Sequence, residues 1–334
     1  MIGTTRRQAV LGAAAATPLL AGPGAASDPL RAAVDAAFAD GATGVLVSRR
    51  GEVVAERYAP DWPGGRPREV ASVAKSVLAV LLAMAVEEGA IRSFDQPAAD
   101  FIPPWRADAR SAISLRHLMS MTSGLDDAGL ALRGIRGDQF AINAAAPLRD
   151  PPGTRWAYNT AAYHLLFHLL ARATGETVDA FAARRLLGPL GMGGTAWVTG
   201  QGVGADGPVT NWYSAACTAR DLLAFGQMVL NGGRGLVSVE ALTTLTAPSQ
   251  ELNPSYGLLW WSNARPGFDA SGRVGGRRFP DAPHDVVAAL GAGGQAVMVV
   301  PSRGVVVVRQ GDPPRSARNL GDLLRAVLAA TGDA

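Results

Sequence analysis

Residues 71–82 read Ala-Ser-Val-Ala-Lys-Ser-Val-Leu-Ala-Val-Leu-Leu. This apolar run, interrupted by one cation, predicts a buried helix from Ser72 to Glu88 that ends before Gly89. Lys75 is the only lysine of the chain, because the other 30 of its 31 basic residues are arginine. Arginine can replace lysine wherever only a surface charge is needed, but guanidinium does not release its proton as a desolvated lysine does. We therefore predict a catalytic role for Lys75.

Ser72 stands three residues before Lys75, which is about one helical turn, so the lysine amine can reach the serine hydroxyl. A serine at a helix N-terminus also lies among free backbone N–H groups that stabilise developing negative charge. The pattern indicates a serine nucleophile with a lysine base. The alternative is a lysine that extends along a half-exposed helix into solvent. The apolar neighbours favour burial and a lowered lysine pKa.

The two ends of the chain have similar patterns, with strands and a helix near each terminus. We therefore predict an α+β fold whose antiparallel sheet is built from both termini and flanked by terminal helices. The expected strands are Gly44–Ser48, Glu52–Tyr58, Gln295–Val300 and Val305–Arg309, and the expected terminal helices are Pro29–Ala39 and about 316–330.

The middle of the chain is predicted to be a large all-helical insertion. Its expected helices after the first are Leu115–Met121, Ala161–Ala173, Val178–Leu186 and Thr218–Leu230. The Gly- and Pro-rich stretches 200–208 and 265–283 are expected to be surface loops. We predict a single domain over residues 27–334, with an α/β lobe from about 27–70 and 265–334 and a helical lobe from about 71–264.

The first 26 residues have the features of a twin-arginine signal peptide. Arg6 and Arg7 precede a weakly apolar, Ala- and Gly-rich stretch, and cleavage is expected after Ala26. The prediction is an exported protein, periplasmic or secreted; the alternatives are a Sec signal or an uncleaved anchor. No later run approaches 18 apolar residues, so no stable membrane span is expected after cleavage.

Charge and cysteine content argue against a nucleic-acid-binding protein and against a disulfide-stabilised fold. The net charge is +3, and removing the two leader arginines leaves +1, which is too small to indicate a nucleic-acid-binding surface. The single cysteine, Cys217, cannot form an internal disulfide. His164 and His168 are four residues apart without a nearby acid or third ligand, so no metal site and no cofactor are predicted.

Six further motifs follow Ser72 in a definite order and spacing. They are Leu115–Leu125 (LRHLMSMTSGL), Pro152–Thr160 (PGTRWAYNT), Gly188–Met192 (GPLGM), Thr218–Leu222 (TARDL), Tyr256–Trp261 (YGLLWW) and Gly291–Gln295 (GAGGQ). With these motifs the chain resembles the serine β-lactamase and penicillin-binding-protein-like hydrolases over nearly all of its length after the leader. The similarity is closest to the branch of class C β-lactamases, family VIII esterases and 6-aminohexanoate-oligomer hydrolases. The resemblance implies a β-lactamase/transpeptidase-like fold.

The resemblance also implies site residues. Tyr158 matches the tyrosine of the family's Tyr-x-Asn motif and would act in acid–base catalysis with Ser72 and Lys75. Thr160 holds the third place and Asn159 stands one residue early, so both are candidate substrate-binding residues and either could take the asparagine role. Trp260 is a candidate wall of the substrate pocket, or else part of the core.

The family's third motif, Lys-Thr-Gly or His-x-Gly, is replaced by Ala292-Gly293-Gly294 followed by Gln295. The resemblance implies that Gly293 and Gly294 line the substrate, and that the N–H groups of Ser72 and Gln295 form an oxyanion hole. The cation that would bind a substrate carboxylate is missing, which favours a neutral ester or amide. The alternative is that a loop arginine, Arg273, Arg277, Arg278 or Arg309, supplies the charge.

The sequence therefore predicts a serine hydrolase that cleaves a small ester, amide or peptide substrate through an acyl-enzyme. One alternative is a β-lactamase or DD-peptidase. An alternative of another class is a non-catalytic protein that binds a ligand or peptidoglycan on the same scaffold. The oligomeric state is not predicted.

Overall fold

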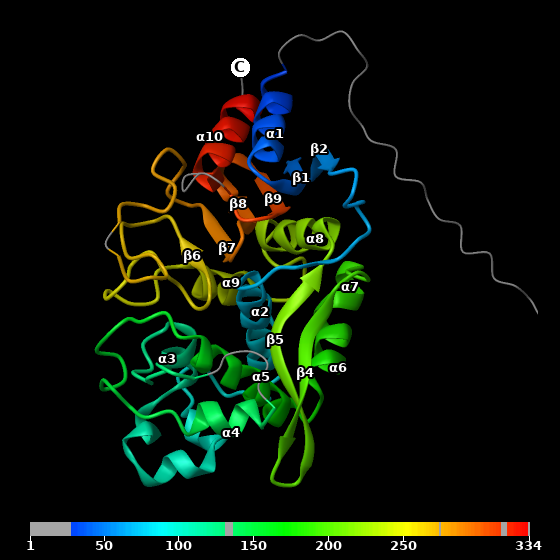
Figure 1. Cartoon of the computed structure of the whole chain (residues 1–334). Helices are drawn as coiled ribbons and strands as arrows, with labels where there is room; N and C mark the ends of the chain where they lie inside the picture. The colour runs from blue at the N-terminus through cyan, green and yellow to red at the C-terminus, as the bar shows by residue number, and fades with distance from the viewer. Residues whose placement is uncertain (1–27, 131–135, 274, 315–318, 333–334) are drawn as a thin grey trace, which may run out of the picture.

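The computed structural model describes residues 28–130, 136–273, 275–314 and 319–332. The predicted signal peptide, residues 1–26, lies outside these ranges. Figure 1 shows a sheet and its helices at one end of the molecule and a mainly helical part at the other.

The strands are β1 (Ala42–Arg49), β2 (Glu52–Tyr58), β3 (Arg68–Glu69), β4 (Ala196–Gly204), β5 (Gly207–Cys217), β6 (Trp261–Ser262), β7 (Val287–Gly291), β8 (Gln295–Val300) and β9 (Val305–Gly311). The helices are α1 (Pro29–Ala39), α2 (Val73–Glu87), α3 (Leu115–Met119), α4 (Gln139–Ala144), α5 (Thr160–Thr174), α6 (Val178–Ala182), α7 (Gly188–Leu190), α8 (Ala219–Leu230), α9 (Val239–Thr246) and α10 (Asn319–Thr331). Short 3₁₀ turns cover Ala98–Asp100, Pro103–Ala107, Ala109–Ala112 and Pro301–Arg303, and a π-helical turn covers Ala183–Leu187.

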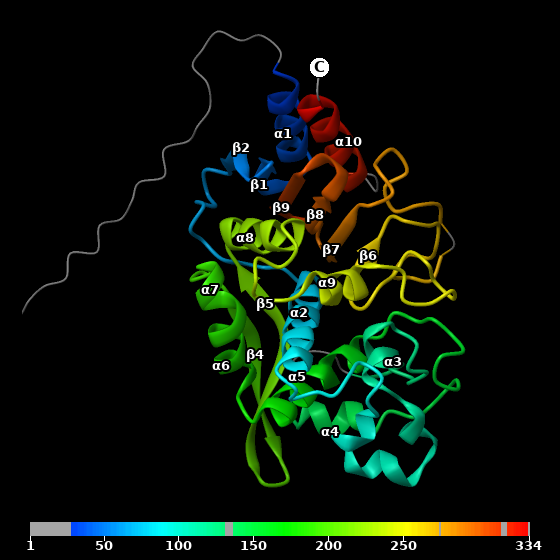
Figure 2. The ribbon, with the colours of Figure 1, turned by 180° about the vertical axis from the view of Figure 1, so that it is seen from behind.

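The larger sheet confirms the predicted α+β class and its construction from both termini. Its strand order is β2-β1-β9-β8-β7-β6 with antiparallel pairing throughout, so β9 from the C-terminal part lies beside β1. The terminal helices α1 and α10 pack together over the sheet, and α8 packs against β1, β8 and β9 from the other side (Figures 1 and 2). A Cβ on Gly226 of α8 would lie 2.6 Å from Val306 Cγ1 and 2.8 Å from Val297 Cγ1. Glycine is required for this close approach of helix and sheet.

The insertion is not all-helical, which corrects the prediction. Strands β4 and β5 form a long hairpin, and β3 joins it in a three-stranded sheet of order β3-β5-β4. The glycines that made residues 200–208 resemble a loop instead permit close contacts within a strand. A Cβ on Gly200 would lie 2.9 Å from the Tyr213 ring, and one on Gly202 would lie 2.1 Å from the Gly137 carbonyl oxygen.

Helix α2 is the central element of the molecule. All residues from Val73 to Ala85 are buried, because α5, α9, β5 and β7 surround the helix. Figure 1 shows α2 between the large sheet and the helical part, so its first turn lies where the two meet. Among the described residues, we find no helix with the length and apolar character that a membrane crossing requires.

Candidate active site

Ser72 lies at a junction of strand, turn and helix. Strand β3 pairs with β5, and the Val70 N–H continues this contact by donating to the Ala215 carbonyl at 2.9 Å. Ala71 then adopts a positive φ of 47°, a strained conformation that the surrounding structure must hold in place. The Ser214 hydroxyl helps to do so by donating to the Ala71 carbonyl at 3.0 Å. Ser72 follows as the N-cap of α2, so its half-buried hydroxyl lies at the helix N-terminus.

Lys75 lies one turn further along α2 and contacts Ser72 directly. Its Nζ is 3.1 Å from Ser72 Oγ, and its side chain is 3% exposed. The amine also lies over two aromatic rings, 4.1 Å from the Tyr163 centroid and 5.2 Å from the Tyr158 centroid. Burial lowers the pKa of Lys75 to about 7. The neutral amine is therefore accessible near neutral pH and can accept the proton of the serine hydroxyl.

Tyr158 lies in an aromatic cluster beside this pair. Its ring stacks on Trp261, with centroids 6.2 Å apart and planes 10° apart, and it meets Tyr256 edge-on at 6.2 Å. Burial raises the pKa of the Tyr158 hydroxyl to about 12, although a hydrogen bond with the Ser72 side chain and the charge of Arg278 oppose this shift. A phenol with this pKa stays protonated at neutral pH, so it is better suited to donate a proton than to accept one.

The β7–β8 hairpin lies beside the N-terminus of α2. The residue beside the Ser72 amide is Gly291, at the end of β7: a Cβ on it would lie 3.2 Å from Ser72 N and 2.2 Å from the Val70 carbonyl oxygen. Gln295 instead begins β8, where it is paired with Gly291. The next amide along the chain is that of Ala292, and we propose its N–H as the second oxyanion donor in place of the predicted N–H of Gln295.

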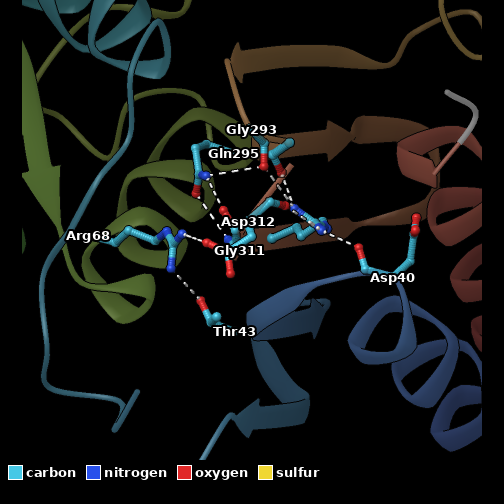
Figure 3. A network of polar contacts seen from close by, with 9 residues as sticks. Asp40, Thr43, Arg68, Gly293, Gln295, Gly311 and Asp312 are labelled. Atoms are coloured by element: carbon cyan, nitrogen blue, oxygen red, sulfur yellow. Dashed lines mark hydrogen bonds and ion pairs between the residues drawn. The ribbon is translucent and has the colours of Figure 1, made fainter. Parts of the chain in front are cut away.

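The side chain of Gln295 has a structural role. Its Nε2 donates to the carbonyl oxygens of Gly311 at 2.5 Å and Gly293 at 3.3 Å, and its Oε1 accepts from the Gly311 N–H at 3.2 Å (Figure 3). The side chain thus ties the hairpin turn to the end of β9.

Arg309, on β9, also binds the β7–β8 turn. This side chain is fully buried, and its Nη1 donates to the carbonyl oxygens of Gly294 at 2.9 Å and Gly293 at 3.3 Å. Its Nη2 donates to the carbonyl oxygens of Asp40 at 3.0 Å and Asp312 at 3.3 Å. Gly293 and Gly294 have φ values of 78° and 74°, which favour glycine. Because the carbonyl oxygens of Gly293 and Gly294 accept from Arg309, they are not free to bind a substrate. The guanidinium of Arg309 is committed to these contacts, so it is not available as a substrate cation.

Asn159 and Thr160 were predicted to bind substrate, and the structure gives Asn159 another role. Its Oδ1 caps α5 by accepting from the Ala162 N–H at 2.7 Å, and its Nδ2 donates to the Leu125 carbonyl at 2.8 Å. The residue is 3% exposed, so its amide is committed to the fold. Thr160 is half-buried as the first residue of α5, and its N–H donates to Asp127 Oδ2 at 3.2 Å.

The two adjacent tryptophans point to different places. Trp260 is fully buried and stacks on Phe225 of α8, with centroids 5.8 Å apart, so it belongs to the core. Trp261 is the one that stacks on Tyr158. Trp260 precedes β6 and Trp261 begins it, and of the two only Trp261 contacts Tyr158.

Comparison with known proteins now adds to this geometry. A model of the Beta-lactamase family matches residues 23–329. The chain belongs to the β-lactamase family.

Individual members of this family share modest sequence identity with the chain. It is 28% identical to human "Putative beta-lactamase-like 1" over 249 residues, 62% of this chain and about half the length of that relative. Its fold is similar to a "putative beta-lactamase" from Bacteroides dorei (TM-score 0.71, 20% identity, 91% of this chain and 98% of the other). It is also similar to a "putative 6-aminohexanoate-dimer hydrolase" from Bacillus anthracis (TM-score 0.69, 18% identity, 89% and 80%).

Some supporting residues of this β-lactamase family member were missed by sequence reasoning. Ser214 holds the turn before Ser72, and the Ser76 hydroxyl donates to the Leu259 carbonyl at 2.7 Å, which ties α2 to the segment carrying Trp261. Ser76 directly follows Lys75 in the quoted stretch, but its partner Leu259 lies 183 residues further along the chain, and Ser214 lies in no recognised motif, so the sequence did not indicate either contact. Within the described ranges, no group of three or more His, Cys, Asp or Glu side chains could hold a metal ion.

Proposed function

We propose that this member of the β-lactamase family is a serine hydrolase that cleaves an ester or amide bond through an acyl-enzyme on Ser72. One observation carries the proposal: Lys75 Nζ lies 3.1 Å from Ser72 Oγ, and burial lowers the pKa of this amine to about 7. A binding protein would gain nothing from a buried lysine that can lose its proton beside a serine hydroxyl.

In the proposed reaction, neutral Lys75 takes the proton from Ser72 Oγ as this oxygen attacks the substrate carbonyl carbon. The N–H groups of Ser72 and Ala292 stabilise the resulting oxyanion. The oxyanion then collapses, the bond to the leaving group breaks, and the Tyr158 hydroxyl protonates the leaving group. The proton on Lys75 restores the Tyr158 hydroxyl. Water then attacks the acyl-enzyme with the same groups in reverse, which releases the acid and free Ser72.

The direct test is labelling of the nucleophile. Mass spectrometry after treatment with a fluorophosphonate or p-nitrophenyl butyrate should find the adduct on Ser72, and Ser72→Ala should neither react nor turn over the ester. A protein that hydrolyses the ester with Ser72 unmodified would contradict the mechanism. If no hydrolysis of short-chain esters, nitrocefin or short amide oligomers is detected, and a thermal-shift assay shows tight ligand binding, the non-catalytic alternative is favoured.

The structure supports a specific arginine as the substrate cation. Arg278 Cζ lies 4.1 Å from the centroid of the Trp261 ring, and Trp261 in turn stacks on Tyr158. Among the described residues, Arg278 has no hydrogen bond or ion pair. Asp269, whose charge acts on Arg278, is already bound by Ser271 and Arg273.

Because Tyr158 would protonate the leaving group and the charge of Arg278 acts on the Tyr158 hydroxyl, Arg278 would lie on the leaving-group side of the scissile bond. We therefore propose a substrate with a carboxylate on its leaving group, in place of the neutral substrate that the sequence favoured. A matched pair of esters, 3-butyryloxybenzoate and the neutral 3-butyryloxybenzamide, tests this. Arg278→Met should lower kcat/KM by roughly ten- to a hundredfold on the anionic ester only, and Arg277→Met should not. An equal loss on both esters would contradict the assignment.

Export by the twin-arginine route is also proposed, and it rests on the sequence of residues 1–26 alone. Replacing Arg6 and Arg7 together with lysine should retain the protein in the cytoplasm, as measured by cell fractionation. Continued export of this variant would favour a Sec signal.

A further inference from the structure

A network of polar contacts joins the segment that carries Ser72 to the β7–β8 hairpin (Figure 3). Arg68 lies on β3, four residues before Ser72, and its guanidinium forms an ion pair with the Asp312 carboxylate and donates to Thr43 Oγ1 at 3.3 Å. The backbone carbonyl of Asp312 accepts from Arg309, which also binds the carbonyl oxygens of Gly293 and Gly294. The chain of contacts therefore leads from one side of the site to the other.

Arg309 is an unusual residue for this position if stability alone mattered. It is fully buried, and in the described part of the chain its guanidinium binds four carbonyl oxygens but no carboxylate. Removing a cation from water is costly, and an apolar side chain of similar size is often equally good for stability. A buried arginine with these partners does what an apolar residue could not: it fixes the orientation of several carbonyl groups at once.

The oxyanion hole needs such a constraint. Its two proposed donors belong to separate segments, the Ser72 N–H to the start of α2 and the Ala292 N–H to the hairpin. Gly293 and Gly294 follow Ala292 directly with positive φ, and glycines leave a turn free to adopt other conformations. A displacement of about 1 Å between groups that act together can cost about a hundredfold in rate.

We infer that Arg309 is a positioning residue that, with Asp312 and Arg68, holds the hairpin at the distance from Ser72 at which both N–H groups reach the oxyanion. This role rests on the proposed function. The network touches no substrate atom; it acts through the turn that carries the donor. Its effect should therefore appear in the stabilisation of the tetrahedral state and not in the binding of the ground-state ester.

The experiment compares wild type, Arg309→Met and Arg309→Lys in two assays. One is kcat and KM for p-nitrophenyl butyrate; the other is the inhibition constant of phenylboronic acid, which forms a tetrahedral adduct with a serine oxygen. Arg309→Met should lower kcat by roughly ten- to a hundredfold and weaken the boronate by a similar factor, with KM nearly unchanged. Arg309→Lys, which keeps a charged donor, should recover part of both losses. Asp312→Asn, which weakens only the link to Arg68, should show a smaller loss in the same direction.

Arg110 provides a matched control. It also donates to backbone carbonyls, those of Ala144 at 2.8 Å and Ala146 at 3.2 Å, but in the helical part of the molecule. Arg110→Met should lower the melting temperature without changing kcat or the boronate constant. Wild-type kcat and boronate affinity in a folded Arg309→Met would overturn the positioning role and leave the hydrolase intact. A wild-type protein that neither turns over the ester nor binds the boronate would overturn the proposed function, and the role of Arg309 with it.

Discussion

Two buried cations in this molecule have opposite environments. Lys75, in the first turn of α2, lies against aromatic rings and one serine hydroxyl, and burial lowers its pKa to about 7. Arg309, on β9, lies among four carbonyl oxygens that accept its N–H groups. The first environment stabilises the neutral form of a group that can lose a proton, and the second stabilises the charge of a group that cannot. The residue type and its partners together decide whether a buried cation is reactive or structural.

The largest expected effect comes from replacing Lys75 with arginine, the residue type found at position 309. Lys75→Arg keeps the charge but removes the base, and its wider head must enter a space bounded by Tyr158 and Tyr163. We expect kcat for p-nitrophenyl butyrate to fall by a factor on the order of 10² or more. Circular dichroism should confirm that the variant is folded. Turnover close to wild type would show that Lys75 acts only as a positive charge.

The rate of hydrolysis should depend on pH through Lys75 and not through Arg309. Because the neutral amine of Lys75 is the proposed base and its pKa is about 7, kcat/KM should fall about tenfold per pH unit below that value. In Arg309→Met, kcat/KM should begin to fall at the same pH as in wild type, since Arg309 does not contact the Lys75 amine. A rate that is constant from pH 5 to pH 8 would contradict the assignment of Lys75 as base.

Stability should respond to Lys75 in the opposite sense to activity. The pKa is about 7 in the folded protein and about 10.4 in an unfolded chain, so between these values the unfolded chain binds more protons. The resulting penalty is fully present below pH 7 and is lost as the pH rises toward 10. Lys75→Met should therefore be more stable than wild type at pH 6, by up to about 4 kcal/mol in urea unfolding. A difference that does not change with pH would count against a buried, depressed lysine.

The smallest expected effect comes from replacing Arg309 with lysine. Arg309→Lys leaves a cation on β9, but its single ammonium cannot reach all four carbonyl oxygens that Arg309 binds. We expect a loss of about 1–2 kcal/mol in the free energy of unfolding, or roughly 2–3 °C in melting temperature for a chain of this length. A variant as stable as wild type would show that the carbonyl contacts of Arg309 contribute little to the free energy of unfolding.

Local spacing was enough to predict the Ser72–Lys75 pair and the sheet built from the two termini. Three residues make about one helical turn, and strands of alternating or continuous apolar residues are visible in short windows, so these features needed no knowledge of distant contacts. The β4–β5 hairpin was missed for the converse reason. Its glycines are explained only by the approach of Tyr213 and Gly137, which the local sequence cannot show.

Residue identity and short spacing were sufficient to identify the family and to predict the contact between Ser72 and the one lysine of the chain. Three other features depend on tertiary packing: Trp261 faces Tyr158, Gly291 lies beside the Ser72 amide, and Arg278 lies over Trp261. Arg278 and Arg309 are the same residue type, and nothing in their neighbours along the chain distinguishes a cation stacked on Trp261 from one bound to Asp40, 269 residues away. Contacts over such separations follow from the packing of the whole chain, which gives each arginine its charge environment and so its role.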